Sequence, residues 1–187
     1  VKTIGQYAFR SCGTDESITE MTVAMGTAVT TMGRNAFESC SKLKSITLPT
    51  TLSEIPQEAF YGTGLTTLTI PASVDSIGYR AFLATDALTN IRFNDASTPV
   101  KLVTNYYIDF GTADKELYIG RDITLMGDYR GRRQFDNVTK ATFGGKATAI
   151  NDQLLDGATK LKTLTIGSSV KTIGQYAFRS CGTDESI

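Results

Sequence analysis

One short phrase recurs along this chain and constrains its fold more than any other feature. The phrase has an apolar residue, two variable residues, a second apolar residue, Gly or Pro, two more variable residues and then Ala-Phe. It reads VKTIGQYAF from Val1, VTTMGRNAF from Val29, LSEIPQEAF from Leu52, VDSIGYRAF from Val74 and VKTIGQYAF again from Val170. Repetition with a period of about 20 to 50 residues is typical of solenoids.

A second phrase follows the first and completes the repeat. It has the form Leu-x-x-Ile-x-Leu followed by Pro or Gly, as in LKSITLP from Leu43 and LKTLTIG from Leu161. Its strict alternation predicts a short strand with one buried face. The spacing of the first phrase predicts instead a turn followed by a short helical piece, with Ala and Phe filling the interior.

The copies begin 22 to 28 residues apart, and the first and last copies begin 169 residues apart, which predicts about seven turns. No turn can bury its apolar face alone, so stability comes from stacking neighbouring turns. We expect short parallel strands in one continuous ladder over residues 1–187. The consensus weakens over residues 94–149, where we expect degenerate repeats with insertions. There, Tyr107-Ile108, Arg130-Gly131 and Leu154-Leu155 stand in place of Ala-Phe.

The combined motif AF-x-x-C-x-x-L-x-x-I-x-L-P-x-x-V-x-x-I-G resembles the BspA-like, or Treponema pallidum-type, class of leucine-rich repeat. The copies from Val29, Leu52, Val74 and Val170, with the start at Val1, carry this resemblance. It implies a leucine-rich-repeat solenoid of the α/β type. Such families are typically surface-exposed proteins of bacteria and some protists that are associated with adhesion. The resemblance therefore implies an extracellular or cell-surface location, and it brings no catalytic residues.

Residues 1–18 and 170–187 share one sequence, VKTIGQYAFRSCGTDESI, at all eighteen positions. Elsewhere the copies agree at core positions and differ at solvent positions, so drift from an ancient repeat does not explain this identity. Either the protein repeats a block of 169 residues in tandem, or the duplication was introduced by cloning. We expect one unit of a longer solenoid, because such arrays otherwise need polar capping repeats. The competing interpretation is a short ectodomain fragment whose ends happen to be duplicated.

The composition limits the classes of function. The chain has 19 Lys or Arg, 19 Asp or Glu and no His, which gives a formal net charge of zero. This balance disfavours a nucleic-acid partner held by bulk electrostatics, and the commonest general base and metal ligand is absent. No apolar run approaches the roughly 18 residues that span a bilayer. We therefore predict no enzyme activity, no cofactor, no metal site and no membrane insertion by this segment. Because the first residue is Val1 and not Met, we also expect the chain to be a fragment or a processed product.

A cluster of Arg and Tyr residues in and beside the degenerate stretch is the best candidate for a protein-binding site, because both types are enriched in binding hot spots. Two members, Arg92 and Tyr118, occupy the middle strand position that Thr fills at Thr22, Thr47, Thr69, Thr142 and Thr165. The alternative is that the aromatic residues fill a poorly formed core and the arginines lie in a solvated loop. The candidate residues are Arg92, Tyr118, Arg121, Tyr129, Arg130, Arg132 and Arg133.

Cys12 and Cys40 lie at the same repeat position, three residues after Phe. Free Cys behaves as a small buried apolar group, so we expect a stacked interior position. A reactive thiol and a disulfide between neighbouring turns are the alternatives. A glycosylation sequon begins at Asn137, although it matters only in a secreted eukaryotic protein.

Two functions remain in competition. The first is a non-catalytic, extracellular structural or adhesive repeat protein, one module of a longer tandem array that forms a fibre or stalk. Its chains would associate end to end or bind a protein partner. The alternative is a ligand-binding leucine-rich-repeat ectodomain that recognises a host, matrix or cell-surface protein.

Overall fold

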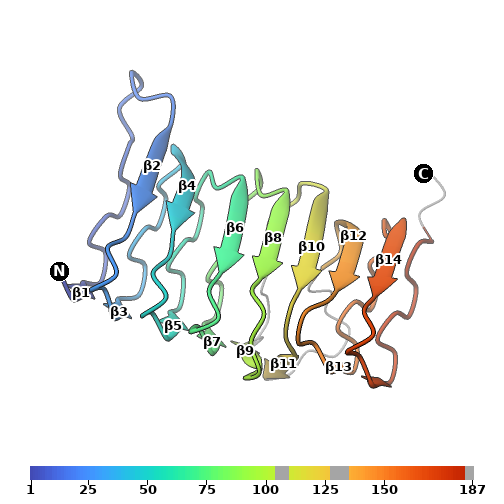
Figure 1. Ribbon diagram of the computed structural model, residues 1–187. Coiled ribbons are helices and arrows are strands. Elements are labelled where there is room, and N and C mark those ends of the chain that lie inside the picture. Colours follow the sequence, from blue (N-terminus) through green and yellow to red (C-terminus); the bar gives the residue numbers. More distant parts are fainter. Residues whose placement is uncertain (104–109, 127–134, 184–187) are drawn as a thin grey trace.

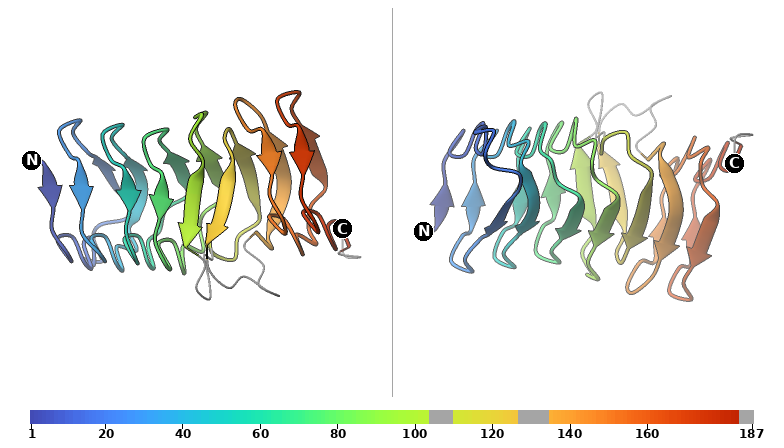
Figure 2. Two further views of the ribbon diagram at one scale, coloured as in Figure 1. Left: turned by 90° about the horizontal axis from the view of Figure 1, so that it is seen from below. Right: turned by 90° about the horizontal axis from the view of Figure 1, so that it is seen from above.

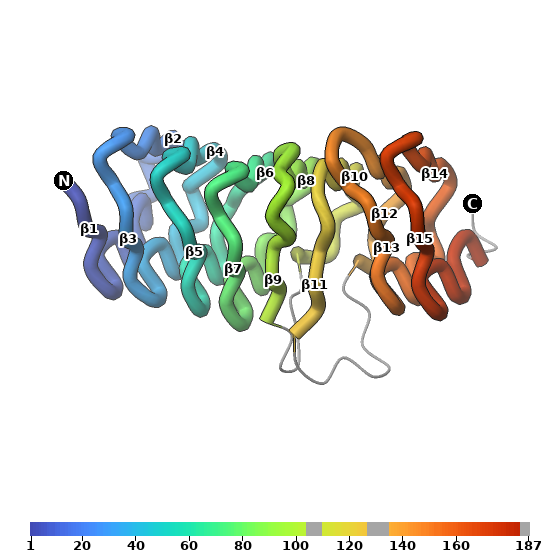
Figure 3. Tube along the Cα trace, turned by 60° about the horizontal axis from the view of Figure 1, so that its bottom comes forward, coloured from blue at the N-terminus to red at the C-terminus, as the bar shows by residue number. Residues whose placement is uncertain are grey.

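A computed structural model describes residues 1–103, 110–126 and 135–183 of the chain. Within these residues every regular element is a β-strand, and every strand pair is parallel. The chain winds as a coil whose turns are stacked side by side, with the two termini at opposite ends of the stack (Figures 1 and 3). The prediction of a solenoid with stacked parallel strands is confirmed.

The strands form two rows on two sides of the coil (Figure 2). The row that we call the broad face contains β2 (Met21–Ala24), β4 (Leu43–Thr47), β6 (Thr67–Ile70), β8 (Asn90–Phe93), β10 (Lys115–Ile119), β12 (Val138–Phe143) and β14 (Thr163–Ile166). The row that we call the narrow face contains β1 (Thr3–Ile4), β3 (Thr31–Met32), β5 (Glu54–Ile55), β7 (Ser76–Ile77), β9 (Val100–Val103), β11 (Ile123–Met126), β13 (Ala149–Ile150) and β15 (Thr172–Ile173). Each turn therefore contributes one strand to each row.

The broad face follows the alternation that the sequence predicts. In β6, Leu68 and Ile70 are buried while Thr67 and Thr69 are exposed. From β6 to β14 each strand pairs with the equivalent strand of the next turn, and β2 pairs with β4. Thr69 faces Arg92 across the β6–β8 pair. Because the side-chain period of a strand is two residues, this register keeps Leu68 and Ile91 on the inner face and Thr69 and Arg92 on the outer face.

A stack of phenylalanine rings runs through the interior beside the strands. The rings of Phe37, Phe60 and Phe82 lie parallel, with centroids 5.4 and 5.5 Å apart and interplanar angles of 10° and 3°. The stack extends to Phe9 on one side, with centroids 4.9 Å apart. All three central rings are fully buried, so each fills the space between its two neighbours.

The same stack corrects the alignment of the degenerate stretch. Tyr107-Ile108 and Arg130-Gly131, which the sequence suggested as replacements for Ala-Phe, lie outside the described residues. Phe110 and Phe135 hold the ring positions instead, with centroids 5.5 Å apart, and Phe110 stacks on Phe82 at 5.4 Å. Extra residues before the ring are tolerated because lengthening a loop costs little free energy, whereas a missing ring leaves a cavity.

The expected short helical piece is wrong, because no helix occurs among the described residues. The segments around Phe9, Phe37, Phe60 and Phe82 form turns in which the residues two before and two after Phe have positive φ, such as Asn35 at 57° and Ser39 at 60°. The N–H groups of Asn35, Phe37 and Ser39 donate to carbonyls of the next turn at 3.2, 2.8 and 2.7 Å. These bonds to the neighbouring turn replace the bonds that a helix would make within itself.

The three cysteines are free. Cys40 is fully buried, and its Sγ donates to the carbonyl of Phe9 in the preceding turn at 2.8 Å. Burial raises the pKa of the Cys40 thiol to about 11, which disfavours the reactive thiolate. The expected interior position is therefore found for Cys40, while Cys12 and Cys181 are half-buried near the ends of the stack.

The ring stack predicts the stability of the solenoid. Phe82→Ala removes a fully buried ring between two others, so we expect the free energy of unfolding to fall by about 3–5 kcal/mol. Phe82→Leu should cost less, because Leu155 occupies the equivalent position of a later turn and is buried there. Urea unfolding of the two variants measures the difference, and equal losses would contradict the expectation that a leucine can fill this position.

Candidate functional site

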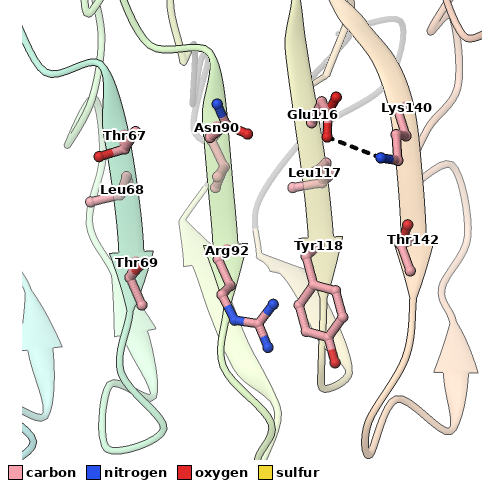
Figure 4. A pocket seen from close by; sticks show the side chains of 11 residues that line it. Thr67, Leu68, Thr69, Asn90, Arg92, Glu116, Leu117, Tyr118, Lys140 and Thr142 are labelled. Carbon is pink, nitrogen blue, oxygen red and sulfur yellow. Dashed lines mark hydrogen bonds and ion pairs between the residues drawn. The ribbon is translucent and has the colours of Figure 1, made fainter.

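The broad face carries a shallow hollow of about 370 Å³ over four neighbouring strands (Figure 4). Its floor is the sheet itself, and outward side chains of the four strands surround it. These outward residues are Thr67, Thr69, Asn90, Arg92, Glu116, Tyr118, Lys140 and Thr142.

Arg92 and Tyr118 form the centre of this hollow. They are direct partners in the β8–β10 register, and the Arg92 guanidinium lies over the Tyr118 ring, 3.8 Å from its centroid. The Nε of Arg92 also donates to Asn94 Oδ1 at 3.2 Å. A cation over an aromatic face is electrostatically favourable, so the two side chains hold each other flat along the sheet.

The hydroxyl of Tyr118 is fixed from the other side by a carboxylate. It donates to Asp95 Oδ1 at 2.8 Å. This hydrogen bond is the main cause that raises the pKa of Tyr118 above its usual range. The Asp95 carboxylate fits closely against Gly120 and Gly145, where a Cβ on either glycine would collide with it.

The outward residues that lie two positions earlier in β10 and β12 form an ion pair. Lys140 Nζ lies 3.2 Å from Glu116 Oε2, across the β10–β12 pair. Both side chains are about half exposed, so the pair contributes little to stability. Arg92 adds a second positive group to the hollow, and Asp95, which accepts from the Tyr118 hydroxyl, adds a negative group beside it.

The structure therefore brings together two of the predicted site residues, Arg92 and Tyr118, and adds neighbours that the sequence analysis missed. Asp95, Glu116 and Lys140 were not singled out, although Glu116 and Lys140 occupy the outward strand position two residues before the Thr series. That spacing was the available signal. The Thr series itself needs one correction, because the β2–β4 register pairs Ala24 with Thr47 and places Thr22 opposite Ser45.

Arg121 does not belong to this surface, so the expectation that it joins an exposed cluster is wrong. Its side chain is fully buried, and its guanidinium donates to the carbonyls of Pro71 and Ala72 at 2.8 and 3.0 Å. Burial lowers the pKa of Arg121, while the nearby Asp75 raises it by a smaller amount. Arg121 thus ties together chain segments far apart in the sequence instead of contacting a partner.

The other predicted site residues, Tyr129, Arg130, Arg132 and Arg133, lie outside the described residues. Within the described ranges there is no cluster of three or more Cys, Asp or Glu side chains that could hold a metal ion. The same part of the chain contains no helix long and apolar enough to cross a membrane. The side chains that line the hollow include an aromatic ring, a guanidinium and groups of both charges.

The Tyr118–Asp95 contact can be tested by titration. Asp95→Asn removes the carboxylate that raises the pKa of Tyr118, both as hydrogen-bond acceptor and as a negative charge. We therefore expect the pKa of Tyr118 to fall toward the usual range of tyrosine. Ultraviolet titration of tyrosinate, with Tyr118→Phe subtracted to isolate this residue, measures the shift, and an unchanged or higher pKa would contradict the assignment.

Comparison with known proteins identifies the repeat. The model of the BspA type leucine rich repeat region matches residues 2–129 and 131–187 in six copies, slightly fewer than the seven turns counted from the sequence. No curated protein sequence matches the chain. Repeats of this kind form protein-interaction modules and are typically non-catalytic.

Among solved structures, a leucine rich repeat protein of T. pallidum matches with a TM-score of 0.55 and 21% identity, covering 98% of this chain and 71% of its own. A leucine-rich repeat protein of Bacteroides ovatus has a TM-score of 0.38 and 18% identity, with 98% and 69% covered. A leucine rich cell surface protein of Faecalibacterium prausnitzii has a TM-score of 0.44 and 22% identity, with 98% and 62% covered. The first of these shares the fold, and the family match covers nearly the whole sequence, so this chain belongs to the BspA-type leucine-rich-repeat family.

Proposed function

We propose that this chain is a non-catalytic, extracellular adhesive module that binds a protein through the broad face, at the hollow centred on Arg92 and Tyr118. The observation that carries the proposal is the Arg92–Tyr118 pair itself, stacked at 3.8 Å on an outward row that is otherwise mostly Thr. Arg and Tyr are the residue types that most often dominate binding energy. Membership of the BspA-type family supports both protein binding and a cell-surface location.

The arrangement of the pair favours binding at low entropic cost. Arg92 is held by the Tyr118 ring and by Asn94, and Tyr118 is held by Asp95, so both side chains are oriented before a partner arrives. Ordering side chains on binding costs about 0.5–1.5 kcal/mol for each long side chain, and a pre-oriented pair avoids part of that cost. A stacked parallel sheet also gives a rigid floor beneath the pair.

Charge reversal tests the binding surface. Arg92→Glu and Tyr118→Ala should each weaken saturable binding to extracellular matrix deposited by cultured epithelial cells by at least about tenfold, a loss of about 1.4 kcal/mol. The matched control is Lys101→Glu, which reverses an exposed charge on β9 of the narrow face. Surface plasmon resonance on the immobilised matrix gives the affinities. An equal loss with Lys101→Glu, or retained binding with Arg92→Glu, would contradict the site, and absence of saturable binding by the unaltered chain would contradict the adhesive role.

We also propose that the chain is one block of a tandem array of 169-residue units, which would make the adhesive surface part of a fibre or stalk. The supporting observation is the eighteen-residue sequence shared by residues 1–18 and 170–187. Both copies adopt the same turns, with positive φ at Tyr7 and Ser11 in the first and at Tyr176 and Ser180 in the second. The backbone conformation of these turns is therefore the same in both copies, as a continuous tandem array requires.

The array predicts the behaviour of a two-block protein, in which residues 1–169 are followed directly by residues 1–187. We expect one continuous solenoid, because neighbouring turns stabilise one another across the junction. Calorimetry should show one unfolding transition at a higher temperature than that of the single block. Two independent transitions at the single-block temperature would show that the blocks do not join.

A further inference from the structure

Arginine side chains stacked on tyrosine rings recur along this solenoid. Among the described residues, four arginines lie over a tyrosine ring, with the guanidinium carbon 3.8 to 5.4 Å from the ring centroid. They are Arg10 over Tyr7, Arg80 over Tyr79, Arg92 over Tyr118 and Arg179 over Tyr176. The contact made by Arg92 is the shortest of the four, and it lies on the broad face.

Three of these arginines also have a carboxylate partner in a neighbouring turn. The pairs are Arg10 with Glu38 at 3.3 Å, Arg80 with Glu58 at 3.9 Å, and Arg179 with Asp156. Arg92 has no such pair among the described residues, where its polar partner is the neutral amide of Asn94, which accepts from Nε at 3.2 Å. Its terminal nitrogens, Nη1 and Nη2, donate no hydrogen bond to any residue that the structure describes. Arg92 therefore has the tyrosine contact of the other three arginines and lacks only their carboxylate.

Two carboxylates lie beside the hollow, and both are already engaged by other groups. Asp95 accepts from the Tyr118 hydroxyl at 2.8 Å, so it holds the ring and not the guanidinium. Glu116 lies 3.2 Å from Lys140 Nζ, two positions earlier along the strands. A carboxylate for Arg92 is therefore left to another molecule.

The position of the guanidinium leaves one edge for a ligand. An arginine can receive a carboxylate through Nε and one Nη, or through both Nη atoms. Nε is taken by Asn94 and one face is covered by Tyr118, so the edge with both Nη atoms remains (Figure 4). Gly144, which directly follows β12, lies close against the same ring, because a Cβ there would be 3.1 Å from Tyr118 Cε2. The ring is thus confined between neighbouring turns and holds Arg92 in place.

We propose that Nη1 and Nη2 of Arg92 bind the side-chain carboxylate of an Asp or Glu residue on the partner protein. This proposal rests on the proposed function, and it adds the chemical class of the group that the hollow recognises. Two parallel charge-assisted hydrogen bonds make this contact stronger and more directional than a single one. Exposed ion pairs usually contribute little because both long side chains must be ordered, whereas Arg92 is ordered before the partner arrives.

The charges around Arg92 favour a carboxylate over a polyanion. A guanidinium also matches phosphate in shape, and sulfated or phosphorylated chains carry many such groups. Asp95 and Glu116 lie beside the hollow, so a polyanion would meet like charges there. The formal net charge of the whole chain is zero, which gives no bulk attraction to a polyanion. A single carboxylate satisfies the single open edge without these costs.

A peptide titration tests the contact directly. The probe is the blocked pentapeptide acetyl-Gly-Ser-Asp-Ser-Gly-amide, with Asn in place of Asp as its neutral match. Side-chain NMR of the isotope-labelled chain should show a saturable shift of the Arg92 signals with the Asp peptide, at least about tenfold weaker with the Asn peptide. The signals of Arg80 should not move, because its guanidinium over Tyr79 is already paired with Glu58.

Two substitutions separate the fork of Arg92 from its charge. Arg92→Lys keeps the positive charge but cannot form two parallel hydrogen bonds, so it should weaken binding of the Asp peptide at least about fivefold. Arg80→Lys makes the same change in an arginine that is stacked on tyrosine but already ion-paired, so it should leave binding unchanged. Circular dichroism of both variants shows whether the solenoid is intact.

The deposited epithelial matrix gives a second readout, in which the partner is altered instead of the chain. Carbodiimide with glycinamide converts protein carboxylates into amides, and it should weaken binding of the unaltered chain at least about tenfold. Enzymes that remove sulfated polysaccharides, or phosphatase, should leave that binding unchanged.

Several results would overturn the carboxylate proposal. They are equal shifts of Arg92 with the Asp and Asn peptides, full binding by Arg92→Lys, and tighter binding of a heparin oligosaccharide or a phosphoserine peptide than of the Asp peptide. If amidation leaves matrix binding unchanged while Arg92→Glu still abolishes it, the carboxylate proposal fails and the proposed protein-binding function stands. The peptide titration needs no matrix, so it decides on the carboxylate even where the matrix is not bound.

Discussion

Backbone pairing between successive turns is the constraint on which the rest of this structure depends. At Asn35, Phe37 and Ser39, the N–H groups donate to the next turn, and this requires positive φ at the two outer positions. Non-glycine residues adopt positive φ at a cost of about 1–2 kcal/mol each, so the conformation persists only because stacked turns supply hydrogen bonds and burial together. The ring stack from Phe9 to Phe135 lies between these turns and fixes their spacing.

This constraint explains why outward residues of the broad face can vary without disturbing the fold. Outward positions of the broad face contribute neither to the ring stack nor to the buried strand residues, so they are free to change from Thr to Arg92 or Tyr118. The cross-strand register then turns two separate substitutions into one site, because it places the two side chains opposite each other.

Sequence periodicity was sufficient to predict the architecture, because each turn repeats the same pattern of buried residues and short strands. The recurring Ala-Phe phrase and the alternating strand phrase predicted stacked parallel strands, buried rings and the BspA-type family. Arg92 and Tyr118 could be proposed from their place in the Thr series alone. Asp95 could not, because it lies beyond the strand and reaches Tyr118 only through the close approach of Gly120 and Gly145.

The amino-acid sequence by itself determined the repeat length and the inward and outward faces of the strands. It also showed that residues 1–18 and 170–187 have the same sequence. Only the tertiary structure decided that the expected helical piece is a run of turns, that Phe110 and Phe135 continue the stack, and that Arg121 is buried. The physical reason is the same in each case. Period and alternation are local properties of the chain, whereas hydrogen bonds to the next turn, ring spacing and burial of a guanidinium against distant carbonyls exist only once the turns are stacked.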